Sequence, residues 1–378
     1  MTSTAAKTNL LGMSQDALEQ FFVEHGDKAF RARQLMQWIY QRGVTDFDDM
    51  TDLSKKLRAW LKDTAEITPP DIQSRYDSSD GTVKWLFESG SGQAVETVFI
   101  PEPGRGTLCI SSQVGCALDC AFCATGAQGF NRNLTSAEII GQVWHAIREL
   151  PRRENGDPAV TNIVFMGMGE PLANYRNVVP VLKLLVSDWA YGLSRRRVTI
   201  STSGLVPLVD KLGDECNVSL AVSLHAPNDD LRDQIVPINK LHPIASLLDA
   251  CWAYTAKHSN RFITFEYVML RDVNDSLAHA DELAELLLGK PAKVNLIPFN
   301  PFPDTRFQRS SADTIMHFQN RLRQRGLVAT TRKTRGDDID AACGQLAGKV
   351  SDRVRKPLGK KSMAARKLAK EKIGMVSA

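Results

Sequence analysis

The chain has 378 residues, of which 43% are hydrophobic and 24% charged, and its net charge is +4 at neutral pH. These values are typical of a soluble globular protein with one large domain and an appendage, and they exclude a collagenous or broadly disordered chain. No apolar stretch reaches the roughly eighteen residues of a membrane span, and the first residues lack the basic and apolar regions of a secretory signal. We therefore expect a cytosolic protein without membrane-spanning segments.

The first part of the chain is predicted to be helical. Helical periodicity marks three segments, residues 14–26, 30–43 and 53–63. Ser14 is the expected N-cap of the first helix, and residues 1–75 are assigned to an N-terminal helical domain. The second helix carries basic and aromatic side chains that suit an RNA-binding surface, whereas Trp38 and Ile39 fit better as packing residues of the domain's own core.

Beyond these helices the apolar pattern changes to the alternation of β-strands. Two strands around a Gly-rich turn predict a β-hairpin within an extension that spans residues 76–105. From residue 106 to residue 350 strands alternate with helices. The predicted strands are residues 107–112, 161–167, 196–202, 218–224, 262–270, 293–299 and 327–333. Six or seven β/α units in succession indicate a parallel sheet, either doubly wound or a complete or partial barrel.

One of the intervening helices has a distinct start signal. Thr135 and Glu138 form the pattern of a capping box at the beginning of residues 135–150. The isoleucine, valine and tryptophan residues that follow recur at helical spacing and make one apolar face. We therefore expect an amphipathic helix packed on the sheet directly after the first predicted strand and its loop.

The seven cysteines are an odd number, which favours free thiols, metal ligands or catalysis over a disulfide framework. Cys216 and Cys251 lie in ordinary stretches and are predicted to be core thiols. Cys116, Cys120 and Cys123 follow the strand at residues 107–112 with C-x3-C-x2-C spacing, and three soft ligands so close together suit a metal centre. Three thiolates on a four-iron cluster would leave one iron open for a substrate. The alternative is a zinc knuckle completed by a distant His or Cys.

Other chemically distinctive residues directly follow predicted strands. They form the motifs MGMGEP (residues 166–171), STSG (201–204), SLH (223–225) and IPFNPFP (297–303). Each motif is weak evidence by itself, because a Gly-Glu-Pro turn is usually a plain loop and a lone histidine at a strand end is usually structural. In a barrel, however, the carboxyl ends of parallel strands meet on one face. The four motifs are therefore expected to surround one ligand.

The segment ISSQVGCALDCAFCATGAQGFNRNL, residues 110–134, resembles the RlmN family of radical S-adenosylmethionine (SAM) enzymes, which methylate C2 of adenine in 23S rRNA and tRNA. The resemblance extends from residue 30 to residue 346. It implies an α/β fold, a partial (β/α)6 radical SAM barrel, as a catalytic core at residues 106–350, preceded by the helical RNA-binding domain and the β-hairpin extension. It also implies a [4Fe-4S] cluster on Cys116, Cys120 and Cys123.

The resemblance assigns roles to further residues. By their positions in the motifs, the implied SAM contacts are Gly169, Glu170, Ser201, Ser223, Leu224, His225 and Asn300. Three residues take catalytic roles: Cys343 as the carrier of the methyl group, Cys109 as the thiol that releases the product, and Glu96 as the proton acceptor. Without the resemblance, each cysteine would be read as a small buried apolar residue and Glu96 as a surface carboxylate.

The resemblance also implies a reaction order. One SAM methylates the thiolate of Cys343, and a second SAM is cleaved at the cluster to activate that methyl group for addition to C2, so that two SAM molecules are used per turnover. Glu96 then removes the C2 proton, and Cys109 attacks Cys343 to free the base and form a disulfide. An external electron donor and a thiol reductant reset the enzyme.

Two alternatives and one segment stay open at this point. A related enzyme that methylates adenine C8 would share the cluster, the cysteine pair and the fold, and a non-catalytic Fe–S or zinc RNA-binding protein would share the three cysteines.

The C-terminal tail, residues 351–378, has nine Lys and Arg residues against two acidic ones, a net +7, so the preceding chain is net −3. The tail either contacts RNA phosphates or only aids solubility. We expect a monomer.

Overall fold

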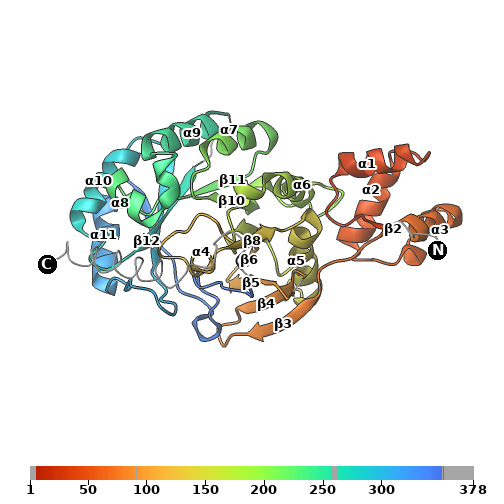
Figure 1. Cartoon of the computed structure of the whole chain (residues 1–378), viewed down its shortest axis with the longest axis horizontal. Helices are drawn as coiled ribbons and strands as arrows, with labels where there is room; N and C mark the ends of the chain where they lie inside the picture. The colour runs from red at the N-terminus through yellow and green to blue at the C-terminus, as the bar shows by residue number, and fades with distance from the viewer. Residues whose placement is uncertain (1–5, 91, 258–261, 351, 353–378) are drawn as a thin grey trace, which may run out of the picture.

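The computed structural model describes residues 6–90, 92–257, 262–350 and 352. A helical N-terminal part lies to one side of a larger body built on a curved sheet (Figure 1). The N-terminal part contains α1 (Gln15–Glu24), α2 (Arg31–Met36), the π-helical turn η1 (Gln37–Gln41), the 3-10 turn η2 (Phe47–Asp49) and α3 (Lys55–Thr64). The short strands β1 (Thr8–Asn9) and β2 (Ala65–Glu66) pair in parallel and bring its two ends together.

The predicted N-terminal helices are present and pack on one another. Ser14 is the N-cap of α1, and its side chain accepts a hydrogen bond from the Ala17 amide. Trp38 and Ile39 are buried in the core, as expected for packing residues. The aromatic content of this helix therefore stabilises the domain, and its exposed basic residues remain available to solvent.

The body is built on a ten-stranded sheet, counted over the described residues, in the order β14-β13-β12-β11-β10-β9-β6-β5-β4-β3. Seven neighbouring strands run parallel: β6 (Arg105–Cys109), β9 (Asn162–Phe165), β10 (Val198–Thr202), β11 (Ser219–Ser223), β12 (Ile263–Met269), β13 (Ala292–Pro298) and β14 (Val328–Thr331). The sheet ends at β14 and at β3, so it curves without closing. This is the predicted partial barrel, with β14 as one parallel strand more than six.

The predicted hairpin extends the sheet on the other side. It consists of β4 (Val83–Glu88) and β5 (Ala94–Glu102), and β5 pairs antiparallel with β6. An additional antiparallel strand, β3 (Ile72–Asp77), pairs with β4 and crosses residue 75, where the sequence analysis placed a domain boundary. β3 escaped prediction because its sequence, IQSRYD, is largely polar and exposed, as an edge strand tolerates.

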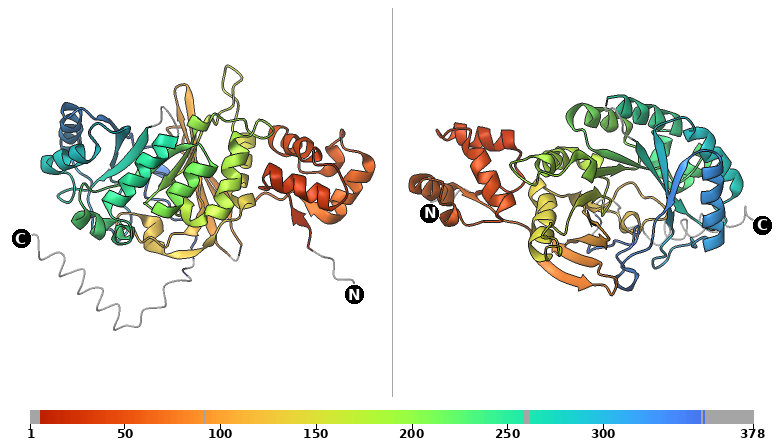
Figure 2. Two further views of the ribbon diagram at one scale, coloured as in Figure 1. Left: turned by 90° about the horizontal axis from the view of Figure 1, so that it is seen from above. Right: turned by 180° about the vertical axis from the view of Figure 1, so that it is seen from behind.

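Helices cover the outer, convex side of the curved sheet (Figures 1 and 2). They are α5 (Ser136–Glu149), α6 (Tyr175–Val186), α7 (Val206–Glu215), α9 (Ile244–Lys257), α10 (Leu277–Leu287) and α11 (Ala312–Gln324). Shorter elements complete the body: β7 (Gln113–Gly115), α4 (Ala124–Gln128), β8 (Phe130–Asn133), α8 (Asp229–Ile235) and the 3-10 turns η3 (Pro171–Asn174), η4 (Arg195–Arg197), η5 (Pro237–Lys240) and η6 (Asp337–Ile339). None of the helices in the described part of the chain has the length and apolar character needed to cross a bilayer.

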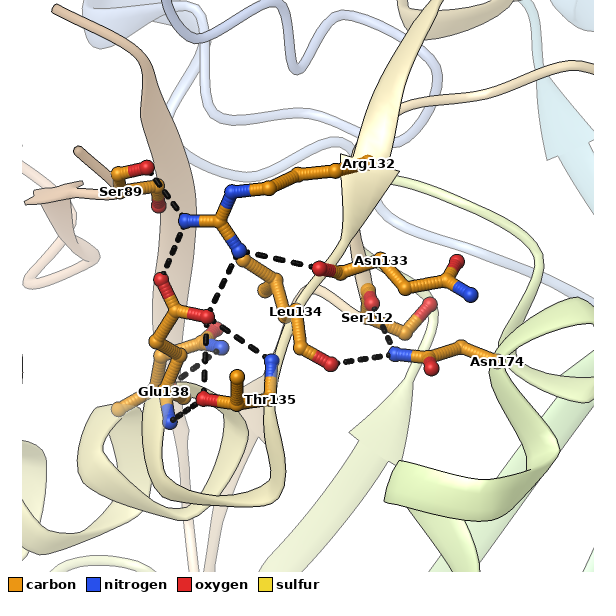
Figure 3. Close-up of polar contacts among 9 residues, drawn as sticks. Ser89, Ser112, Arg132, Asn133, Leu134, Thr135, Glu138 and Asn174 are labelled. Atoms are coloured by element: carbon orange, nitrogen blue, oxygen red, sulfur yellow. Dashed lines mark hydrogen bonds and ion pairs between the residues drawn. The ribbon is translucent and has the colours of Figure 1, made fainter. Parts of the chain in front are cut away.

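The predicted capping box starts α5. The Thr135 hydroxyl accepts from the Glu138 amide at 3.2 Å, and the Glu138 carboxylate accepts from the Thr135 amide at 2.8 Å. Arg132, at the end of β8, donates to both carboxylate oxygens of Glu138, and Asn174 donates to the carbonyls of Ser112 and Leu134 (Figure 3). These bonds fix the loop that returns from the cysteine motif onto the sheet.

After β14 the chain turns back along the inner side of the sheet. The main chains of Lys349 and Ala94 exchange two hydrogen bonds of 2.9 Å, which pairs this segment with β5. The Gly344 carbonyl accepts from the Ala124 amide at 2.9 Å, and the Leu346 carbonyl accepts from the Thr125 hydroxyl at 2.5 Å. Residues 341–350 are thereby held against both β5 and α4, and they carry Cys343 between the two.

Candidate active site at the carboxyl ends of the strands

An open cavity lies at the carboxyl ends of the parallel strands. All four strand-end motifs line it, as does the cysteine loop; the last motif contributes Ile297 and Phe299. The predicted site residues on its wall are Cys116, Cys120, Cys123, Gly169, Glu170, Ser201, Ser223, His225 and Cys343. Gly169, Glu170, Ser201, Ser223 and His225 thus share one cavity, as expected for residues at the carboxyl ends of parallel strands, and Cys343 reaches the same cavity from the segment after β14.

The cysteine loop runs from the end of β7 into α4. Cys116 directly follows β7, and its amide donates to the Gly129 carbonyl at 2.7 Å. Cys123 is the N-cap residue of α4, and its amide donates to the Cys120 carbonyl at 3.1 Å. Asp119, between the first two cysteines, adopts a positive φ of 55°, which turns the loop tightly enough to bring the three thiols to one wall.

The three thiols perturb one another. Burial raises the pKa of Cys116 to about 12, and repulsion from Cys123 adds to this rise. Burial also raises the pKa of Cys120 and Cys123. Without a cation the thiols are thus held protonated, whereas a bound metal stabilises thiolates and reverses this preference.

Glu170 is buried beside the cysteine loop. Its carboxylate accepts from the Leu172 amide at 3.0 Å and from the Ser203 amide at 2.8 Å, while its own amide donates to the Gln113 side chain. Burial raises its pKa to about 7, because these donors only partly replace water. A buried carboxylate in this state is suited to receive a cationic group of a ligand.

The segment after β11 presents different atoms to the cavity. His225 adopts a positive φ of 61°, and its Nδ1 accepts from the Val268 amide at 3.0 Å. Burial, reinforced by the charge of Arg232, lowers its pKa to about 3, so the ring is neutral at ordinary pH. Leu224 is fully buried and lines neither cavity; its amide donates to the Glu266 carbonyl at 3.1 Å and its carbonyl accepts from Arg232, so its assignment as a SAM contact stays a prediction.

A second, smaller cavity adjoins the first. Met166, Ile297, Arg332 and Cys343 line both cavities, so Cys343 lies in their shared wall. The second cavity also contains Cys109, the other cysteine of the predicted pair. The chain thus brings together two cysteines that are more than two hundred residues apart in the sequence.

The two cysteines of this pair have different environments. Cys109 is buried at the end of β6; burial raises its pKa to about 12, the charge of Cys343 adds to the rise, and the nearby Arg332 opposes it. Cys343 is only partly buried, and its Sγ accepts a hydrogen bond from Nη1 of Arg332 at 2.9 Å.

Glu96 is buried on β5, so the alternative interpretation as a surface carboxylate is wrong. Its Oε1 lies 3.1 Å from Nζ of Lys84, and its Oε2 accepts from the Ala347 amide at 2.9 Å. Glu96 is not among the residues that line either cavity. It instead contacts the segment that carries Cys343, four residues after that cysteine.

Asn300 lies in the second cavity, not in the first. Its Nδ2 donates to the Cys343 carbonyl at 3.1 Å, and its Oδ1 accepts from Arg309 at 2.6 Å. The structure therefore gives Asn300 a contact with the main chain of Cys343, which the sequence did not indicate. Its assignment as a SAM contact stays a prediction.

Comparisons with known proteins agree with this arrangement. The family model of the ribosomal RNA large subunit methyltransferase N-terminal domain matches residues 8–67, and that of the radical SAM superfamily matches residues 110–287. The dual-specificity RNA methyltransferase RlmN of Marinobacter nauticus is 56% identical over 357 residues, which cover 94% of this chain and 97% of that protein. The chain belongs to the RlmN family. The crystal structure of a radical SAM methyltransferase from Sphaerobacter thermophilus is 47% identical, with a TM-score of 0.83, and the match covers 90% of this chain and 99% of that one.

Membership of the RlmN family makes the protein an enzyme, a methyltransferase of the radical SAM superfamily. The superfamily implies SAM and a [4Fe-4S] cluster, and the cavity fits both groups. Three thiols on one wall supply soft ligands for iron, and the remaining wall offers carboxylate, hydroxyl and main-chain groups for a polar ligand. No three His, Cys, Asp or Glu side chains of the described residues form a finished metal site, so this fit rests on the shared cavity and on the chemistry of the thiols.

Several residues in and around this RlmN-family site were not predicted from the sequence. Arg332 directly follows β14, so the rule that flagged the other strand ends would have found it. Glu266 and Lys84 lie inside strands, where no motif marks a polar residue as buried. Arg232 lies on α8, behind the wall of the cavity, and its importance depends on contacts that the sequence does not reveal.

Proposed function

We propose that this protein methylates C2 of an adenine in 23S rRNA and tRNA, in the cytoplasm, through a methyl group carried on Cys343. The observation that carries the proposal is the position of Cys343 in the wall shared by the two cavities, together with Cys109 in the second cavity. A thiol in this position can accept a methyl group from one side and present it to a base on the other.

The chemistry of the substrate explains the need for a carrier. C2 of adenine is electron-poor and does not attack the methyl group of SAM as an ordinary nucleophile. A cysteine thiolate does, and the displacement leaves a thioether on Cys343. When bound, the reduced [4Fe-4S] cluster and a second SAM molecule supply the radical chemistry that activates this thioether for addition to C2, so two SAM molecules are used per turnover.

The first cavity is proposed to bind SAM. The buried carboxylate of Glu170 is proposed to accept from the amino group of SAM, and Gly169 is proposed to let the ligand approach the main chain closely. Ser201 and Ser223 offer hydroxyls, and the neutral ring of His225 adds a contact without a competing charge. Leu224 and Asn300 complete the proposed set by their positions in the motifs; neither lines the first cavity, and Asn300 instead lies in the second cavity with its amide on the Cys343 carbonyl.

The second cavity is proposed to receive the adenine. Its walls include apolar side chains, and its lining includes Lys333 and Arg335, which suit phosphate groups of an RNA strand. A base inside folded RNA must leave its stack to enter such a cavity. The N-terminal domain is proposed to bind the surrounding RNA. The basic tail, residues 351–378, lies outside the described residues apart from Asp352, and its contact with RNA stays a prediction, as does the monomeric state.

Release of the product is assigned to two residues. Glu96 is proposed to accept the C2 proton; it lines neither cavity, and its contact with Ala347 places it beside the Cys343 segment. Cys109 then gives up its proton and attacks Sγ of Cys343, so that a disulfide bond forms; the electron pair of the broken carbon–sulfur bond goes to the methylene carbon, which takes up a proton to become the methyl group of the product. An external thiol reductant restores both cysteines, and an external donor supplies the electrons for the cluster.

The test is reconstitution under anaerobic conditions with iron, sulfide, a reductant, SAM and an RNA fragment, followed by mass spectrometry of the methylated adenine. We expect 2-methyladenine; 8-methyladenine would assign the other regiochemistry. If the protein cleaves SAM but does not methylate the RNA, the assigned substrate is wrong. If it neither assembles a cluster nor cleaves SAM, it is a binding protein and not this enzyme.

Variants of the cysteine pair test the carrier. Cys343→Ala is expected to abolish RNA methylation while SAM cleavage persists, and Cys109→Ala to accumulate a covalent protein–RNA adduct. Cys216→Ala is the matched control, because Cys216 is a buried thiol that lines neither cavity. Full methylation by Cys343→Ala would contradict the proposal.

A further inference from the structure

Glu266 lies in the wall of the first cavity, beside the proposed SAM contact Ser223. The two residues are paired neighbours on β11 and β12, and both line this cavity. Glu266 is only 5% exposed, although it lies in the middle of a strand that is otherwise largely apolar. Its carboxylate can therefore be hydrogen-bonded only by the protein or by what the cavity holds.

The protein satisfies only part of this carboxylate. Oε2 accepts from the Asn295 side chain at 2.8 Å, and Asn295 in turn accepts from the Thr330 hydroxyl at 3.2 Å. No other described residue donates a hydrogen bond to the carboxylate, and Arg332 and Lys293 act on it only through longer-range attraction. A buried carboxylate without an ion pair is costly, and such groups are concentrated at catalytic and ligand-binding sites.

The surroundings of Glu266 select the kind of group that it can bind. Arg332 lines the same cavity, so a cationic group placed beside the carboxylate would also be repelled by the guanidinium. A neutral donor avoids this repulsion. A carboxylate offers only acceptors, which suits adjacent hydroxyl groups, whereas the edge of an adenine ring presents a donor next to an acceptor. The hydroxyls of a ribose are the best match, and acidic side chains bind ribose hydroxyls in dinucleotide sites.

The position of Glu266 indicates which ribose it contacts. Glu266 lines the first cavity, proposed for SAM, and is absent from the lining of the second, which is proposed for the RNA base. Its negative charge also disfavours the phosphate groups of an RNA strand. Glu170, the proposed acceptor for the amino group of SAM, follows β9, and β12 lies three strands further along the sheet. The two carboxylates thus occupy separate parts of one cavity.

We propose that Glu266 binds the ribose hydroxyl groups of SAM. The assignment rests on the proposed function, in which the first cavity holds SAM. Asn295 occupies Oε2 and leaves Oε1 for the ligand, while Ser223 adds a hydroxyl at the same level of the sheet. Glu170 and Glu266 then hold two different groups of the same SAM molecule, which fixes both ends of its aminoalkyl chain.

The test combines a change in the ligand with a change in the protein. S-Adenosylhomocysteine is the probe, because it has the ribose of SAM but no methyl group to transfer, and its 2′-deoxy and 3′-deoxy analogues each lack one hydroxyl. Calorimetric titration of the full-length anaerobic holoprotein gives the Kd of each. We expect the unmodified protein to bind at least one deoxy analogue roughly tenfold more weakly than S-adenosylhomocysteine. Glu266→Met should bind S-adenosylhomocysteine more weakly by a similar factor and should no longer discriminate against that analogue.

Val268→Ala is the matched control. Val268 lies two residues further along β12, lines the same cavity and offers no side-chain acceptor. The alanine variant is expected to change the Kd of all three ligands by one common factor and to keep the discrimination. A residue that only shapes the cavity behaves in this way, so full discrimination in Glu266→Met would overturn the proposal. Equal binding of all three ligands by the unmodified protein would overturn it as well.

A second variant covers the case in which Glu266→Met does not fold, as judged by urea unfolding. Glu266→Gln loses the charge but keeps the shape of the side chain. The Thr330 hydroxyl orients Asn295, so the amide oxygen of the glutamine should remain on Asn295 and its NH2 group should face the cavity. Discrimination is then expected to fall severalfold, and full discrimination in this variant would overturn the proposal.

The proposed function is tested separately in the same samples, by adding SAM, a reductant and the RNA fragment. Discrimination that depends on Glu266, without methylated adenine, would support the assignment and contradict the proposed function. Methylated adenine together with full discrimination in Glu266→Met would overturn the assignment alone. An unmodified holoprotein that binds neither S-adenosylhomocysteine nor SAM would overturn both.

Discussion

Arg232 joins the two loops that line the proposed SAM cavity. Its side chain is fully buried on α8. Nε donates to the Leu224 carbonyl at 3.0 Å, Nη2 to the carbonyls of Ser203 at 2.7 Å and Ser223 at 3.0 Å, and Nη1 to the Asn239 side chain at 2.7 Å. Burial lowers the pKa of Arg232 to about 10, so the group remains charged at neutral pH. One guanidinium thus fixes the main chain after β10 and after β11.

Replacement of Arg232 by methionine tests this role. Methionine roughly keeps the length of the side chain but removes four hydrogen bonds, three of which go to main-chain carbonyls. Each hydrogen bond to a charged group contributes about 1.5–3 kcal/mol, and part of this gain is offset because the cost of burying the charge is also removed. We therefore expect the free energy of unfolding to fall by about 3–5 kcal/mol and SAM to bind at least about tenfold more weakly, since Ser201 and Ser223 lie at the ends of β10 and β11, where the released loops begin.

Urea unfolding of the full chain and calorimetric titration with SAM measure the two effects. Arg232→Lys is the matched variant; it retains the charge but not the geometry, and it should lose about half as much stability. A methionine variant that loses less than about 1 kcal/mol, with unchanged SAM affinity, would refute the argument that this guanidinium organises the two loops.

Three further substitutions test other parts of the structure. Burial lowers the pKa of His225 to about 3, so below pH 6.5 the folded protein binds fewer protons than the unfolded chain and its stability falls with decreasing pH. His225→Gln lacks this titrating group and should be spared about 2 kcal/mol of the loss at pH 5. Urea unfolding at pH 7 and at pH 5 measures the difference. Lys84→Met leaves the carboxylate of Glu96 buried without its cation and should lower the free energy of unfolding by about 3 kcal/mol in the same assay. The double variant with Glu96→Gln should recover most of that loss. If it recovers none, Lys84 and Glu96 do not form a direct pair. In Gly348→Ala the new Cβ would lie 2.3 Å from a main-chain oxygen of β5, at a φ of +51°. This variant should therefore lose more free energy of unfolding than Gly90→Ala, whose position has a positive φ but open space around it. Equal losses would show that the contact with β5 is unimportant.

Much of the fold followed from local patterns. The succession of alternating strand and helix segments predicted the parallel strands, and Thr135 and Glu138 form the capping box that their spacing predicted. The edge strand β3 was missed because its polar sequence lacks the alternation of a half-buried strand. The pair β7 and β8 was missed because both strands are very short and belong to the loop that carries the cysteines.

Some residues of the candidate site could likewise be predicted from local patterns, and others could not. Glu170, Ser201 and His225 share a cavity with the cysteine loop because parallel strands place their carboxyl ends together, which is a property of the sheet and therefore readable from the strand pattern. The environments of Glu96 and Cys343 depend instead on the path of residues 341–350 back across the sheet. That path is fixed by hydrogen bonds between residues far apart in the chain, and no local pattern encodes it.

The measurement that tests the central claim most directly is a single-turnover chase of the methyl group on Cys343. The protein is first loaded with isotopically labelled SAM, freed of excess SAM, and then mixed with RNA and unlabelled SAM under reducing, anaerobic conditions. If Cys343 carries the methyl group, the label should leave its peptide and appear on C2 of adenine in the first turnover. An unlabelled methyl group in the first product, with the label still on Cys343, would contradict the account.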